Sequence, residues 1–68
     1  MRLTALRCQV PYAQEGLIRR ELEGTGASLQ GVVHGALVEF VFSLPEAAAA
    51  ALVARLNEAC HGRIGWLE

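Results

Sequence analysis

The alternation of hydrophobic and polar positions is clearest in residues 27–43, which read ASLQGVVHGALVEFVFS. Phe40 and Phe42 recur there with the period of two that places alternate side chains on one face of a β-strand. A two-residue turn at His34-Gly35 would fold an earlier strand back onto this one. The predicted hairpin has six residues on its core face: Leu29, Gly31, Val33, Val38, Phe40 and Phe42.

The remaining pattern predicts two further strands and two amphipathic helices. They are a strand at Leu3–Val10, a helix that starts at Tyr12 and stops at Gly24-Thr25-Gly26, a helix opened by Leu44-Pro45-Glu46 and closed by His61-Gly62, and a strand from Arg63 to Glu68. Gly16 is unfavourable inside a helix, so we expect either the close approach of a strand or ligand, or simple tolerance near the helix start.

The inward residues of these elements follow from the same periods. We expect them to be Leu6, Cys8 and Val10, then Ala13, Leu17, Ile18 and Leu22, and then Ala49, Leu52, Val53, Leu56 and Cys60. In the last strand Ile64 and Trp66 share one side, and Gly65 and Leu67 share the other. The order β-α-β-β-α-β predicts an α+β, ferredoxin-like fold for residues 1–68 as one domain. Its four-stranded antiparallel sheet should have the strand order 4-1-3-2, with both helices on one face.

Composition narrows the classes of function. The 68 residues carry a net charge of −1, all basic residues are arginine, and 53% of the residues are hydrophobic. This charge gives no general attraction to nucleic acid or to an anionic membrane, and the chain has no apolar run long enough to span one. The first ten residues lack the apolar stretch of a secretory signal, so we expect a cytoplasmic protein.

The order of motifs resembles that of a known family. The runs LRCQVPYAQEGLIRRELEGTGASL and HGALVEFVFSLPEAAAAALVARLNEACHGRI contain the motifs Tyr12-Ala13-Gln14-Glu15-Gly16, Leu44-Pro45-Glu46, and Arg55-Leu56 through Gly62-Arg63. They resemble the carboxyl-terminal domain of the YigZ / IMPACT-like family. The resemblance implies a ferredoxin-like domain similar to the carboxyl-terminal domains of elongation factor G, usually preceded by a larger amino-terminal IMPACT domain, and a possible association with translation.

Few residues are suited to catalysis or metal binding. Cys8 and Cys60 are expected to be buried small hydrophobes at the same end of the domain, where oxidation could join them in an incidental disulfide. Neither has an identifiable base with an orienting acid, and His34 and His61 show no ligand spacing with them. We therefore expect a protein that is not an enzyme and holds no cofactor or metal.

The uncovered face of the sheet is the stronger candidate for function. We expect an aliphatic patch with a polar rim there, whose proposed interaction residues are Leu3, Ala5, Arg7, Val32, Leu37, Glu39 and Val41. Such a face suits a protein partner, which could be an amino-terminal IMPACT-type domain or a second copy of the chain. It offers no aromatic ring on which a base could stack.

Two alternatives remain open. The resemblance to a translation factor suggests contact with structured RNA or the ribosome, for which the candidate residues are Arg7, Arg19, Arg20 and Arg63. The same topology also occurs in domains that sense amino acids, and Val10–Gly16 could then form the wall of a pocket.

Overall fold

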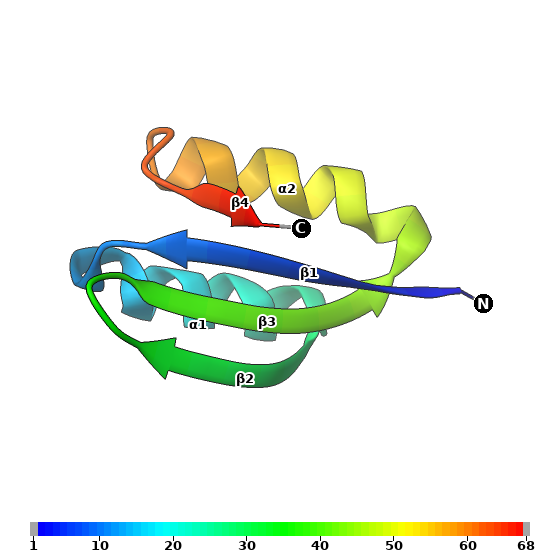
Figure 1. Cartoon of the computed structure of the whole chain (residues 1–68). Coiled ribbons are helices and arrows are strands. Elements are labelled where there is room, and N and C mark those ends of the chain that lie inside the picture. Colours follow the sequence, from blue (N-terminus) through cyan, green and yellow to red (C-terminus); the bar gives the residue numbers. More distant parts are fainter. Residues whose placement is uncertain (1, 68) are drawn as a thin grey trace.

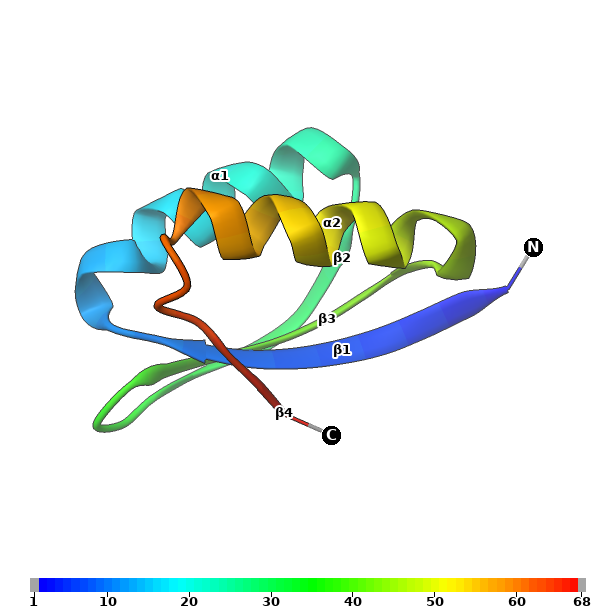
Figure 2. The same cartoon turned by 90° about the horizontal axis from the view of Figure 1, so that it is seen from above.

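The computed structural model describes residues 2–67 and confirms the predicted order of elements (Figure 1). The elements are β1 (Leu3–Val10), the short 3-10 helix η1 (Tyr12–Gln14), α1 (Glu15–Thr25), β2 (Ser28–His34), β3 (Val38–Pro45), α2 (Glu46–Ala59) and β4 (Gly65–Leu67). All strand pairs are antiparallel and the order across the sheet is β2-β3-β1-β4, which is the predicted order. Figure 2 shows both helices on one side of the sheet. The fold is therefore the expected ferredoxin-like α+β arrangement.

The core lies between the helices and the two central strands. Phe40 and Phe42 are fully buried there, as the alternation along β3 predicted. The core also contains Cys8 and Val10 of β1, Ile18 and Leu22 of α1, Leu52 and Leu56 of α2, and Cys60, which directly follows α2. Each buried phenylalanine stabilises the fold by about 1.5–3 kcal/mol through removal of its ring from water. Ala13 was expected inside but is exposed, because it lies in η1 before α1 begins.

The predicted register of the hairpin is wrong. The turn is a three-residue loop, Gly35 to Leu37, so that His34 pairs with Val38 and ends β2 instead of forming the turn. Val32 consequently faces the helices opposite Phe40, and Val33 faces away from them with 59% of its surface exposed. The error in the turn does not change which residues of β3 face inward, because β3 also pairs with β1 along its other edge.

A bulge in β2 limits the error to one end of the strand. The register of β2 against β3 shifts between Leu29 and Gly31. A bulge adds one residue to a strand and so exchanges the two faces beyond it. Leu29 therefore lies opposite Phe42 on the helix side, as predicted, but it is 40% exposed at the edge of the sheet. Gly31 was predicted on the core face and instead lies opposite Val41, on the outer face.

Left-handed residues end both helices. Helix α1 continues through Gly24 and Thr25 and stops at Gly26, whose φ of 75° is one that glycine adopts without steric cost. After α2, both His61 and Gly62 are left-handed, with φ of 52° and 78°. Both predicted helix ends are confirmed, although within Gly24-Thr25-Gly26 only Gly26 terminates α1.

The final strand is shorter than predicted. It covers Gly65 to Leu67, while Arg63 precedes it and Glu68 lies outside the described residues. Trp66 lies opposite Cys8, and its ring meets Phe42 edge-on with the centroids 6.5 Å apart. Its indole N–H donates to the Asn57 side-chain oxygen at 3.0 Å, which ties β4 to α2.

Candidate functional site

The outer face of the sheet is the face away from both helices. The pairing places Leu3, Ala5 and Arg7 of β1 on this face, together with Glu39 and Val41 of β3. Leu3 is 67% exposed. Arg7 and Glu39 form an ion pair of 3.1 Å near the middle of the face. Five of the seven predicted interaction residues therefore share one surface.

The other two predicted interaction residues do not lie on a strand of the outer face. Val32 faces the helices and packs against the core, because the longer loop reverses the faces of this part of β2. Leu37 is in the loop and is 40% exposed. Val33 and Leu67, which lies opposite Arg7, take up outer-face positions instead. We define the outer patch as Leu3, Ala5, Arg7, Val33, Glu39, Val41 and Leu67.

A polar cluster that was not among the predictions from sequence joins the hairpin to the start of α1. His34 Nε2 lies 2.8 Å from a Glu15 carboxylate oxygen, and Arg19 lies 3.4 Å from the same oxygen. The Tyr12 ring stacks on His34 with centroids 5.9 Å apart, and its hydroxyl donates to the Gly35 carbonyl at 2.5 Å. Hydrogen bonding from His34, aided by Arg19, lowers the pKa of Glu15 below its ordinary 4.5. The cluster therefore anchors the hairpin loop to the helix.

A signal for this cluster exists in the sequence. Tyr12 and Glu15 belong to the Tyr-Ala-Gln-Glu-Gly motif that carried the family resemblance, and both make the contacts described above. Gly16 completes the motif, yet no atom lies within 4 Å of the position that a Cβ would occupy on it. No strand thus approaches it, and the interpretations that remain for Gly16 are a ligand in this open space and tolerance near the helix start.

The four arginines proposed for RNA contact do not gather on one surface. Arg7 is on the outer face of the sheet, whereas Arg19 and Arg20 are on α1, which covers the opposite face. Arg19 is paired with Glu15 and its guanidinium lies 5.8 Å from the centre of the Phe40 ring. Arg63 is exposed in the segment between α2 and β4. The structure thus provides separate positive charges on different sides of the molecule.

Both cysteines are buried as free thiols. Burial, together with the proximity of Cys60, raises the pKa of the Cys8 thiol from 9.0 to about 11. Burial also raises the pKa of Cys60. Because the thiolate is the reactive form, both side chains are poor nucleophiles at neutral pH.

Within residues 2–67 no group of three or more His, Cys, Asp or Glu side chains could hold a metal ion, and no helix there is long and apolar enough to cross a membrane.

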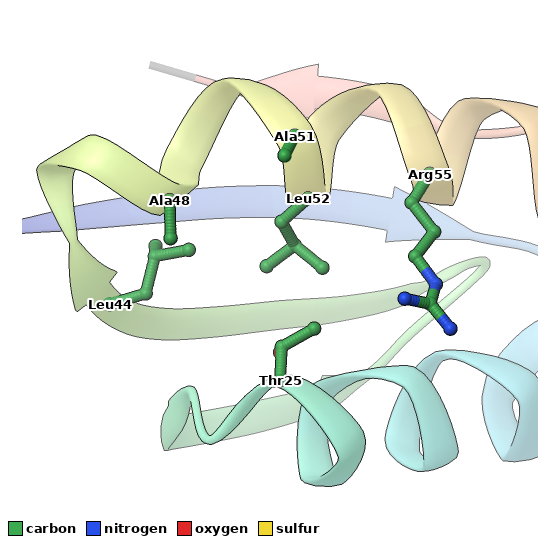
Figure 3. A pocket seen from close by; sticks show the side chains of 6 residues that line it. All are labelled: Thr25, Leu44, Ala48, Ala51, Leu52 and Arg55. Atoms are coloured by element: carbon green, nitrogen blue, oxygen red, sulfur yellow. The ribbon is translucent and has the colours of Figure 1, made fainter.

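A cavity of about 130 Å³ lies between the carboxyl-terminal end of α1 and the first half of α2 (Figure 3). Six residues line it: Thr25, Leu44, Ala48, Ala51, Leu52 and Arg55. No residue of Val10–Gly16, the segment proposed as a pocket wall, takes part, since it precedes or begins α1 and the cavity is at the other end of that helix. The run of short side chains from Ala47 to Ala51 was visible in the sequence, but its position over a gap between the helices was not.

Comparisons with known proteins show a family and solved structures of similar fold. The model of a family described as a domain of unknown function (DUF1949) matches residues 8–63. No curated protein matches the chain significantly. A crystal structure described as that of an hypothetical protein is 26% identical, with a TM-score of 0.85, and the match covers 96% of this chain and 32% of that one. This chain thus spans about a third of the length of that protein.

Proposed function

This chain belongs to the DUF1949 family, which is the carboxyl-terminal domain of YigZ/IMPACT-like proteins, and we propose that it is a non-catalytic domain that docks on another domain through the outer patch. Membership confirms the resemblance seen in the sequence. The similarity to elongation factor G stays a prediction.

The exposure and chemistry of the outer patch are the observation that carries this proposal. Leu3 and Val33 expose 67% and 59% of their surface, although both are aliphatic and sit on regular strands. The two helices lie on the other side of the sheet and cannot cover them. Surfaces of this kind, on which exposed aliphatic side chains stand among polar groups, are characteristic of protein interfaces.

The proposed occupant is the remaining domain of the same polypeptide in YigZ/IMPACT-like proteins. The match to the solved structure leaves about two thirds of that protein outside this fold, which is enough chain for a larger partner domain. Interfaces between domains of one chain are usually more polar than those of obligate dimers. The ion pair between Arg7 and Glu39 in the middle of the outer patch fits that character.

Other features support a binding role over a catalytic one. The two thiols are buried and have raised pKa values, and His34 is engaged by Glu15 and Tyr12. Contact with RNA is less well supported, because the candidate arginines lie on different sides of the molecule and the net charge is −1.

The test is a titration of the isotope-labelled chain with the separately expressed amino-terminal part of a YigZ/IMPACT-like protein, followed by NMR. We expect amide shifts around Leu3–Arg7, Val33 and Val41. Val33→Glu should weaken binding at least about tenfold, since it places a charge in an apolar contact. Leu29→Glu is the matched control, because Leu29 is a similarly exposed residue of the same strand on the helix side. It should bind as the wild type does.

Two results would contradict the proposal. One is a titration whose shifts map to α1 and α2, or that shows no shifts at all. The other is concentration-dependent self-association, measured by sedimentation, that Val33→Glu abolishes, since the occupant would then be a second copy of the chain.

A further inference from the structure

The cavity between α1 and α2 has walls that favour a hydrocarbon group over water. Leu44 and Leu52 form its floor and the short side chains of Ala48 and Ala51 leave it unfilled. The Thr25 hydroxyl already donates to backbone carbonyls of its own helix, those of Glu21 and Leu22, at 3.2 and 3.1 Å. Apart from the Arg55 guanidinium at one end, the lining therefore offers a ligand only apolar contacts.

The size of the cavity sets the size of the ligand. Its volume of about 130 Å³ is close to that of engineered apolar cavities of roughly 150 Å³ that bind benzene, although those are enclosed and this one is open to solvent on one side. A single aromatic ring or a branched chain of four or five carbons is therefore the largest group that fits. A longer chain would have to leave through the open side.

One end of the cavity carries a positively charged group. The Arg55 side chain reaches from α2 toward α1 (Figure 3). Its Nε pairs with a Glu21 carboxylate oxygen at 2.6 Å. A guanidinium has five N–H donors, and this contact uses the one on Nε. The Arg55 side chain is 65% exposed, so its terminal nitrogens can be reached from solvent. They form the planar, two-pronged donor pair that suits a carboxylate.

We propose that this cavity binds a small carboxylic acid, whose single ring or branched hydrocarbon group fills the apolar space while its carboxylate accepts hydrogen bonds from Arg55. Glu21 competes for the same guanidinium and limits the affinity. The site lies on the helix side of the sheet, opposite the outer patch, so the inference does not depend on the proposed docking function.

Benzoate is the probe, and benzyl alcohol, which has the same ring without the charge, is its control. In an NMR titration we expect benzoate to shift the amides of Thr25, Ala48 and Leu52 saturably, with a dissociation constant in the millimolar range. Benzyl alcohol should bind the same residues several-fold more weakly. Absence of saturable shifts at these residues, or equal affinity for the two compounds, would overturn the proposal.

Four variants separate the contributions of shape and charge. Ala51→Leu fills the cavity and should reduce benzoate affinity at least about tenfold, while Ala50→Leu, in the same helix but outside the lining, should leave it unchanged. Arg55→Gln should reduce benzoate affinity to that of the alcohol, and Glu21→Gln should raise it by freeing the guanidinium. Arg55→Gln and Glu21→Gln break the same ion pair, so a loss of stability from that pair would change benzoate affinity in the same direction in both variants. Only binding through Arg55 changes the affinity in opposite directions. Changes of the same sign would refute the role of Arg55.

Discussion

Three glycines in and after α1 allow one substitution, glycine to alanine, to be tested in two opposite backbone conformations. Gly16 and Gly24 lie within the helix, and no atom is within 4 Å of the position that a Cβ would take at either. Gly26 also has open space around it, but its backbone is left-handed with a φ of 75°. The three sites therefore differ in backbone conformation and not in steric room.

The expected magnitudes follow from that difference. Alanine is better than glycine in a helix by roughly 0.5–1 kcal/mol, chiefly because it restricts the unfolded chain. Gly16→Ala and Gly24→Ala should each raise the free energy of unfolding by about that amount, toward its lower end because both lie near helix ends. Gly26→Ala should lower it by about 1–2 kcal/mol, the cost of the left-handed region for a residue with a Cβ.

Urea unfolding followed by circular dichroism measures these changes, and thermal melts should show shifts of roughly 2–8 °C upward for each helical variant of a domain this small. The opposite sign at Gly26 is the internal control, since it shows that the assay detects conformational strain. Destabilisation by Gly16→Ala would refute the reasoning, because it would mean that something does approach this residue. The idea of a strand in close approach to Gly16 would then return.

Three further outcomes can be measured on the same chain. Phe42→Ala should cost about 3–5 kcal/mol in urea unfolding, since the ring is fully buried against Trp66. The contacts of Glu15 lower its pKa, so they stabilise the fold above pH 4.5, and this stabilisation is lost as the pH falls toward the folded-state pKa. Glu15→Gln should therefore flatten the acid limb of the plot of unfolding free energy against pH. Cys8 and Cys60 should react with iodoacetamide near pH 8 only as fast as the chain opens, so labelling rates should rise in step with urea.

The elements that sequence predicted best are those whose side chains alternate between very different environments. Along β3, Phe40 and Phe42 are fully buried while Glu39 and Val41 on the other face are not. Exchanging these faces would expose two phenylalanine rings, at about 1.5–3 kcal/mol each, and no other term in a small domain is large enough to reverse that preference. The strand and its inward face followed from this one contrast.

The register of β2 lacked such a contrast. Positions 32 and 33 are both valine, so the hydrophobic pattern does not indicate which of the two side chains faces inward. In the structure His34 is the last residue of β2, where it contacts Glu15 and Tyr12. These contacts join segments that are 19 and 22 positions apart, which no local pattern reveals.

The same ambiguity explains why the predicted outer face kept its character although its membership changed. Reversing part of β2 replaced Val32 by Val33, one aliphatic side chain by an identical one, so the patch remained apolar. The hairpin tip behaved differently, because moving His34 out of the turn created a polar cluster where none was expected. An error of register therefore leaves a functional prediction intact where neighbouring residues are alike. It changes the prediction where a single titratable side chain, such as His34, moves from a turn into a strand. The docking proposal rests on the first kind of position, and its test through Val33 against Leu29 depends on the corrected register.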